Sequence, residues 1–156
     1  MPAARTEGSS PREDQTVARL MRRHFIAVAP EDSLLDAFQL MRFARLRFLP
    51  VVRGDVLVGF LGFPDVLASV LQELSGRSPP GTPSLAAMPV AQVMRPPVET
   101  VVPATALADA AASLVRAATG CLPVVDPGGP GPRLLGIVTE TDLLRAALER
   151  EPRLLP

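Results

Sequence analysis

The hydrophobic positions of this chain alternate between a helical and an extended spacing. Leu34, Ala37 and Met41 recur at the spacing that keeps side chains on one face of a helix. Two short apolar runs follow, at residues 48–52 and 56–61, and an Arg-Gly-Asp turn separates them. The pattern therefore predicts an amphipathic helix followed by a β-hairpin.

Further elements are predicted on both sides of this helix and hairpin. A short helix is expected at residues 17–22 and a brief strand at 26–28, and Ser33 can cap the free amides where the main helix begins. A closing helix is expected at residues 63–73. The predicted unit is thus β-α-β-β-α with a leading helical turn.

The same unit occurs a second time. Val17-Ala18-x-x-Met21-Arg22 matches Val90-Ala91-x-x-Met94-Arg95, and Leu49-Pro50-Val51-Val52 matches Leu122-Pro123-Val124-Val125. The second copy predicts a leading turn at 89–94, a brief strand at 100–102, a main helix capped by Thr105, a hairpin with a long Pro- and Gly-rich loop, and a closing helix at 140–149.

One such unit is too small to be stable alone, so the two units are expected to pack together as a pseudo-two-fold pair. The fold class is α/β in the broad α+β sense. The expected organisation is a disordered tail at 1–14, a first repeat at 15–74, a linker at 75–87, a second repeat at 88–150 and a tail at 151–156.

Composition excludes several classes of function. The 16 basic residues, all Arg, balance 16 acidic residues, so no general attraction to nucleic acid or to an anionic bilayer is expected. The stretch at 56–71 is interrupted by Pro64 and Asp65 and is too short to cross a membrane. With no secretory signal in the first 16 residues, a cytoplasmic location without membrane insertion is predicted.

Catalysis is not expected from these residues. One Cys and one His provide neither a disulfide nor a zinc site, and the absence of Lys removes Schiff-base chemistry. No nucleophile, base and orienting group occur at a convincing spacing. The sequence therefore predicts neither an enzyme nor a metal protein.

The repeated motifs resemble the tandem cystathionine beta-synthase (CBS) domain pair, or Bateman module. The resemblance rests on Val-Ala-Gln-Val-Met at 90–94, Leu-Pro-Val-Val-Asp at 122–126 and Gly-Ile-Val-Thr-Glu-Thr-Asp-Leu-Leu at 136–144. It covers residues 15–150. It implies a regulatory module that binds an adenosine-containing effector, of the AMP, ADP, ATP or S-adenosylmethionine type, between its repeats, with no obligatory cofactor.

The Gly-x-x-Thr-x-x-Asp motif suggests how such a ligand is held. Gly136 permits a close backbone approach, and Thr139 presents a hydroxyl where the last helix begins. Asp142 can accept hydrogen bonds from both hydroxyls of a ribose, and the amino end of that helix favours phosphate oxygens.

The resemblance implies the rest of this cleft. Ile137 and Val28 would sandwich the adenine ring, beside Ala29 and Phe48. Arg47 would supply a planar positive charge for a phosphate.

A second, weaker cleft is expected around Asp65. Gly62 stands where the first cleft has its threonine hydroxyl. The opposite wall, with Val101, Gly120 and Cys121, has no basic residue at the position that matches the arginine of the first cleft. The two clefts should therefore be unequal: the Asp142 cleft is expected to hold the ligand, and the Asp65 cleft is expected to be empty or specialised for another ligand.

Structural roles compete with these assignments. Thr139 and Asp142 can form a capping pair, and Asp65 can serve in the first turn of its helix. Arg47 can belong to a solvated helix end.

The leading hypothesis is a stand-alone regulatory module that signals to an unidentified partner protein. The family resemblance also implies a homodimer of flat discs. The alternative is a structural module for dimerisation or protein interaction with vestigial clefts.

Overall fold

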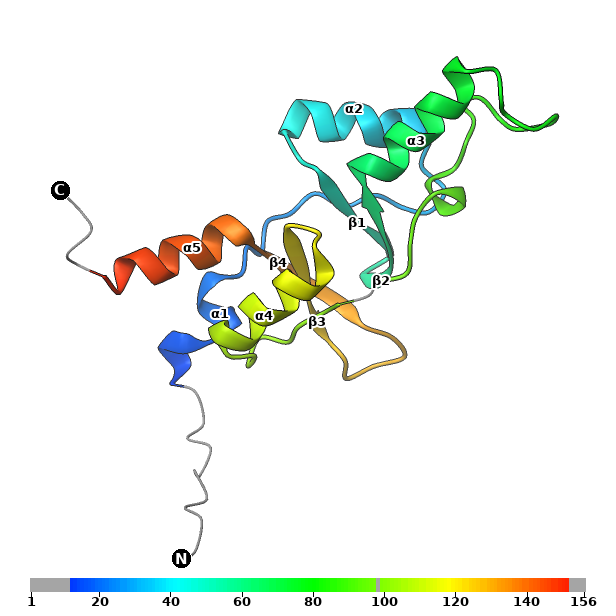
Figure 1. Cartoon of the computed structure of the whole chain (residues 1–156). Helices are drawn as coiled ribbons and strands as arrows, with labels where there is room; N and C mark the ends of the chain where they lie inside the picture. The colour runs from blue at the N-terminus through cyan, green and yellow to red at the C-terminus, as the bar shows by residue number, and fades with distance from the viewer. Residues whose placement is uncertain (1–11, 98, 152–156) are drawn as a thin grey trace, which may run out of the picture.

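The computed structural model describes residues 12–97 and 99–151; the remainder of the two predicted tails lies outside them (Figure 1). Two helix–hairpin–helix units follow a short 3-10 helix and a one-turn helix, and a second 3-10 helix separates them. The elements are η1 (Glu13–Gln15), α1 (Val17–Leu20), α2 (Leu34–Ala44), β1 (Phe48–Arg53), β2 (Val56–Gly62), α3 (Phe63–Leu74), η2 (Val90–Gln92), α4 (Leu107–Ala117), β3 (Cys121–Asp126), β4 (Arg133–Thr139) and α5 (Glu140–Glu149).

The four strands form one antiparallel sheet in the order β1-β2-β4-β3. The hairpins are joined through one residue pair, Val56 with Arg133, so the sheet is nearly two separate ribbons. Each hairpin carries an irregularity at the same place, between Val51 and Val52 in one and between Val124 and Val125 in the other. The mixed fold class and the repeated helix–hairpin–helix arrangement are confirmed.

The brief first strand of each repeat is shorter than predicted. Val28 and Val101 each form a single parallel bridge, to Val51 and Val124 respectively. Proline occupies the position two residues after each bridge, where a parallel ladder would need its next backbone N–H donor.

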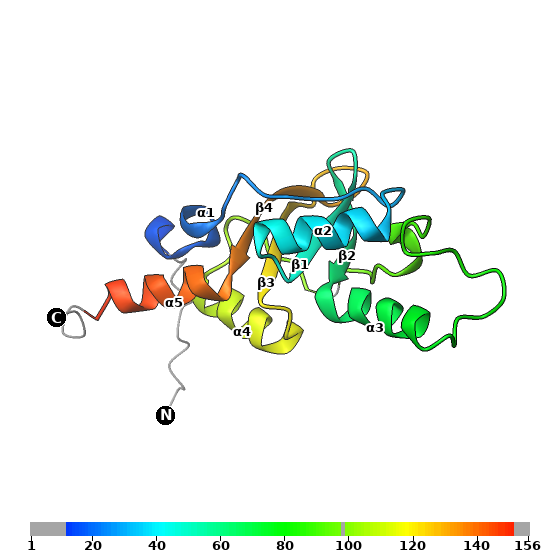
Figure 2. The same ribbon diagram turned by 90° about the horizontal axis from the view of Figure 1, so that it is seen from above.

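The leading segment of each repeat packs on the opposite repeat. Val17 and Met21 lie in the core of the second unit, whereas Met88 and Val90 lie in the core of the first. Figures 1 and 2 both show α1 beside α4 and α5, away from the rest of its own repeat. The two units are therefore tied together by exchanged segments.

The two main helices begin differently. Ser33 caps α2 as predicted, accepting a hydrogen bond from the Asp36 backbone N–H at 3.0 Å. The predicted cap by Thr105 is wrong, because Ala106 is the N-cap residue of α4 and provides no side-chain bond. Thr105 Oγ1 accepts from the Val102 backbone N–H at 3.1 Å instead.

Within the described residues, no helix has both the length and the apolar character that crossing a bilayer requires.

Candidate functional site

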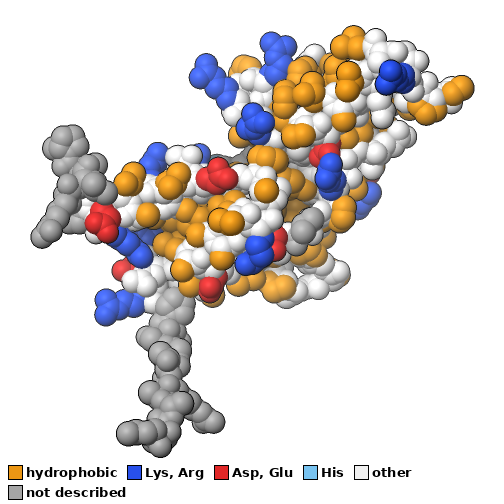
Figure 3. Space-filling model, in the orientation of Figure 1, with side chains coloured by type: hydrophobic (Ala, Val, Ile, Leu, Met, Phe, Trp, Pro, Cys, Tyr) orange, Lys and Arg blue, Asp and Glu red, His pale blue; other side chains and the backbone are white. Residues whose placement is uncertain are grey.

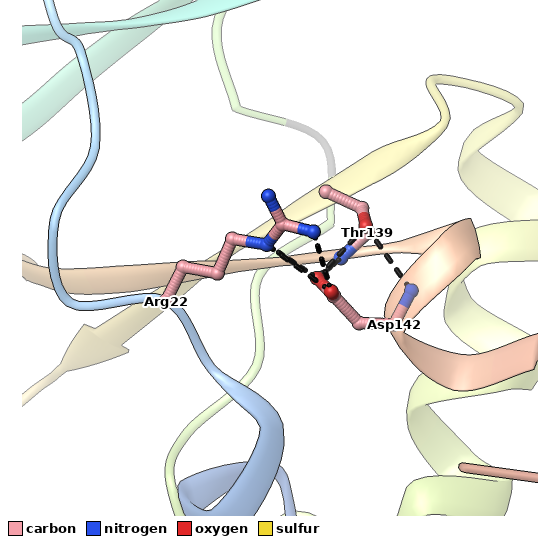
Figure 4. Close-up of polar contacts among 3 residues, drawn as sticks. All are labelled: Arg22, Thr139 and Asp142. Atoms are coloured by element: carbon pink, nitrogen blue, oxygen red, sulfur yellow. Dashed lines mark hydrogen bonds and ion pairs between the residues drawn. The ribbon is translucent and has the colours of Figure 1, made fainter. Parts of the chain in front are cut away.

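The Asp142 carboxylate at the start of α5 is bound by an arginine from the far end of the chain (Figure 4). Arg22 donates to Oδ1 from Nη2 at 2.8 Å and from Nε at 3.1 Å, and Nε also lies 3.2 Å from Oδ2. The Asp142 side chain is 9% exposed and the Arg22 side chain 51% exposed. In this pair, the Asp142 carboxylate is therefore largely shielded from water, whereas the Arg22 side chain is half exposed.

Thr139 completes the environment of this carboxylate. Its backbone N–H donates to Asp142 Oδ2 at 3.0 Å and its hydroxyl donates to the same oxygen at 2.8 Å. The two side chains form a capping box at the start of α5. The capping role expected as the alternative for Thr139 and Asp142 is therefore present. Any ligand that binds the Asp142 carboxylate must compete with the groups that already donate to it.

These contacts set the charge state of the pair. Burial raises the pKa of Asp142, but the hydrogen bonds from Arg22 and Thr139 outweigh burial and leave that pKa below its ordinary value. The hydrogen bond and charge of Asp142 raise the pKa of Arg22. Both groups are therefore ionised at neutral pH.

The position of Arg22 depends on Gly136. The backbones of Arg22 and Ile137 exchange two hydrogen bonds, with N···O distances of 2.8 and 3.0 Å. A Cβ at Gly136 would lie 2.6 Å from the Arg22 carbonyl oxygen. The close backbone approach expected at Gly136 is therefore made by the chain itself, since Arg22 occupies that space.

The same arrangement occurs in the other half of the molecule. Arg95 exchanges backbone hydrogen bonds with Phe60, at 2.8 and 2.9 Å. Its Nε donates to Asp65 Oδ1 at 2.8 Å, and Nη2 contacts the same oxygen. Because Gly62 has no side chain, α3 has no hydroxyl partner for Asp65 and no side-chain cap.

Sequence reasoning missed both arginines. Their signal was present, because the Met-Arg dipeptide is repeated at Arg22 and Arg95 while the two aspartates are repeated as well. The pairing itself was hidden, because each dipeptide packs on the opposite repeat.

The described contacts of three other residues assigned to the first cleft are with neighbours from the first repeat. Val28 is buried and bridged to its own hairpin, and the Ala29 backbone N–H donates to Asp32. The Arg47 guanidinium lies over the Phe63 ring at 5.8 Å from its centroid. Within the described residues, neither Arg47 nor Val28 shares a hydrogen bond or ion pair with Asp142.

Phe48 lies where the two repeats meet. Its ring stacks on Phe60, with centroids 5.5 Å apart. Its edge is also close enough to Gly120 that a Cβ there would approach to 3.1 Å. The structure thus places a residue of the predicted first cleft against a residue of the predicted second cleft.

A cavity of about 170 Å³ lies beside the second cleft. Its wall combines Cys121 and Thr119 with two basic side chains, Arg95 and Arg116. This volume is smaller than the ~300–1,000 Å³ typical of ligand pockets.

The side chain of Cys121 is buried at this cleft. Burial, with a smaller contribution from the charge of Glu140, raises the pKa of its thiol to about 12. The thiol therefore stays protonated and unreactive at neutral pH.

Comparison with known proteins identifies the fold. The model of the CBS domain family matches residues 17–72 and 90–149. The chain belongs to the CBS domain family and contains two CBS domains in tandem.

Solved structures and one curated relative extend this comparison. The crystal structure of CBSX2 in complex with AMP, a CBS-pair protein known from Arabidopsis thaliana, is 32% identical, with a TM-score of 0.72 over 87% of this chain and 98% of that one. The AcuB protein from Vibrio cholerae is 27% identical, with a TM-score of 0.72 over 88% of this chain and 95% of that chain.

An uncharacterized 33.4 kDa protein in the ribosomal RNA operon of Thermofilum pendens is 31% identical over 130 residues, which are 82% of this chain and 42% of that protein. The chain therefore spans about two fifths of the length of this curated relative.

Proposed function

We propose that this CBS pair is a regulatory module that binds an adenosine-containing ligand, of the AMP, ADP, ATP or S-adenosylmethionine type, between its repeats. The observation that carries the proposal is the similarity to CBSX2, which was crystallised with AMP and matches this chain over 87% of its length. No reaction is assigned to the module.

Asp142 is the residue proposed to receive the ribose. Its carboxylate is fixed in the first turn of the ten-residue helix α5, where the helix dipole favours negative charge. A ribose diol could bond both carboxylate oxygens, but the guanidinium of Arg22 must first leave. The backbone of Arg22 is bonded to β4 of the second unit, and the chain runs on from Arg22 into the first unit, so this exchange would act on the segment that connects the two units.

The proposed signal is a population shift. A ligand held by groups of both repeats favours one relative orientation of the two weakly joined hairpins. A partner protein or a second copy of the chain would sense that orientation. The cleft at Asp65 would bind more weakly, because Gly62 leaves it without the hydroxyl that Thr139 supplies.

Thermal unfolding in the presence of AMP, ADP, ATP and S-adenosylmethionine tests this function. A ligand at one hundred times its dissociation constant should add about 2.7 kcal/mol to the free energy of unfolding. Asp142→Asn should remove the shift while Asp65→Asn, the matched control, retains most of it. Equal losses in the two variants contradict the proposed inequality of the clefts, and no shift with any of these ligands contradicts binding.

A second candidate function is supported by the apolar helix surfaces. Figure 3 shows hydrophobic side chains on the outer faces of both helix pairs. Among the large exposed apolar residues are Phe43 at 91% exposure, Val115 at 82%, Leu74 at 80%, Leu71 at 66% and Leu144 at 64%. Such faces suit a second copy of this chain, so the module would serve as a homodimer whose clefts no longer bind ligand.

Light scattering coupled to gel filtration distinguishes the two candidates. A dimer that is lost in Val115→Glu and Leu144→Glu variants, together with no thermal response to adenosyl compounds, favours the structural module. A ligand-dependent thermal shift favours the regulatory module, whether or not the protein is dimeric.

A further inference from the structure

We propose that Arg22 determines ligand specificity by selecting adenosyl compounds that carry a negative charge, such as nucleotide phosphates, over neutral or cationic ones. This inference rests on the proposed function, since it assigns the chemical class of ligand for the Asp142 cleft. It uses a residue that the sequence motifs did not include.

The argument begins with competition for one carboxylate. Arg22 contacts both oxygens of Asp142, and these are the atoms that a ribose diol would need. Thr139 donates to Oδ2 alone, so Oδ1 is held entirely by the arginine. A diol can therefore bind to both oxygens only by displacing the guanidinium.

The displaced guanidinium would remain beside the ligand. The backbone of Arg22 is fixed by its two hydrogen bonds to Ile137, whereas its side chain is 51% exposed and has room to turn. Arg22 can therefore change its partner without leaving the cleft.

The charge balance then decides which ligands bind. A neutral adenosine would take the carboxylate from Arg22 and leave a cation with water as its partner. A phosphorylated nucleoside returns an anion to that cation, and the planar guanidinium matches the oxygen geometry of a phosphate. S-adenosylmethionine carries a sulfonium and an ammonium beside its single carboxylate, so its net charge is positive and it returns less negative charge to Arg22 than a phosphate does.

The other half of the molecule contains a corresponding arginine–aspartate pair. Arg95 binds Asp65 and lines the cavity together with Arg116, which is itself paired with Glu99, so a guanidinium displaced there would remain at the cavity wall. Two carboxylates in one chain are thus each covered by an arginine with a fixed backbone and an exposed side chain.

Isothermal titration with AMP, adenosine and S-adenosylmethionine tests the proposal. The unmodified protein should bind AMP about tenfold or more tightly than adenosine. Arg22→Gln should weaken AMP binding about tenfold and reduce the AMP-to-adenosine preference to near unity, because glutamine has no positive charge to pair with the phosphate. Arg22→Lys, which retains the charge, should preserve part of the preference.

Arg23→Gln is the matched control, because it removes the same charge from the exposed neighbouring residue and leaves the carboxylate contacts in place. Its preference should equal that of the unmodified protein. Circular dichroism and melting temperature establish that each variant is folded.

The possible failures are separable. If AMP binds and Asp142→Asn abolishes binding, but Arg22→Gln retains the preference for AMP, the specificity role of Arg22 is wrong and the ligand site stands. If Arg23→Gln lowers the preference as much as Arg22→Gln, a general surface charge effect replaces the proposal. If the unmodified protein binds none of the three compounds, both the site and the role of Arg22 are wrong.

Discussion

The two arginine–aspartate pairs have the same backbone arrangement, and they differ in the groups that surround the aspartate. In each pair, the arginine is fixed to a strand by two backbone hydrogen bonds and reaches the first turn of the following helix. Among the residues that the structure describes, Asp142 accepts five hydrogen bonds, from Arg22 and Thr139, whereas Asp65 accepts two, both from Arg95. One side chain, Thr139 in place of Gly62, therefore separates a buried structural carboxylate from a more accessible one.

The largest predicted effect concerns the glycines that admit the two arginines. A Cβ at Gly136 would lie 2.6 Å from the Arg22 backbone oxygen, and the Arg22 backbone is bonded to the same strand. A Cβ at Gly59 would meet the Met94 sulfur at the same distance, but a flexible thioether can move, and the nearest backbone atom, the Arg95 carbonyl oxygen, would lie farther away at 3.2 Å. Gly136→Ala should cost about 3 kcal/mol of unfolding free energy and Gly59→Ala about 1 kcal/mol.

Urea unfolding of the two variants measures this difference. A smaller cost for Gly136→Ala than for Gly59→Ala would mean that the Arg22 segment is not held against β4. That result would also remove the basis for placing Arg22 at the ligand cleft.

The next effect separates the two aspartates directly. Asp142→Ala removes the reciprocal half of the capping box and the acceptor for Arg22, so it should lower the unfolding free energy by about 2 kcal/mol. Asp65→Ala removes only a partly exposed ion pair and should cost less than about 1 kcal/mol. Equal costs, measured by urea unfolding, would show that Thr139 adds nothing to the stability provided by the arginine.

Much of the local structure was accessible from the sequence. The amphipathic spacing of 34–44 and 107–117 gave both main helices, and the repeated Leu-Pro-Val-Val motif gave both hairpins, because these features depend on neighbouring residues. Thr105 was assigned wrongly as a cap because its hydroxyl bonds backward to Val102, a choice that helix-start patterns do not distinguish.

The ligand cleft was harder to predict from the sequence. Asp142 and Arg22 are 120 residues apart, and their contact requires the leading segment to cross onto the opposite repeat. No local periodicity encodes that exchange. The predicted roles of Arg47 and Phe48 stay predictions, since in this structure the first lies over Phe63 and the second packs between Phe60 and Gly120.

A third prediction uses pH to examine the buried pair. Since folding lowers the Asp142 pKa below its ordinary value of 3.8, ionised Asp142 stabilises the folded state above that pH. The contribution is lost as pH falls through the lower folded pKa. The difference in unfolding free energy between the unmodified protein and Asp142→Asn should be constant above about pH 5 and shrink below it. A difference that grows on acidification would contradict the ion pair.

The smallest predicted effect concerns a feature that the two repeats share. Arg45 and Ala118 end the main helices at matching positions, with left-handed φ values of 54° and 52°. A non-glycine residue pays a steric cost there that glycine avoids. Arg45→Gly and Ala118→Gly should each raise the unfolding free energy by about 0.5 kcal/mol, since the greater freedom of glycine in the unfolded chain offsets part of the gain. Thermal unfolding should give equal shifts, because the strain belongs to the duplicated backbone; unequal shifts would show that the surroundings of the two helix ends differ as much as those of the two aspartates.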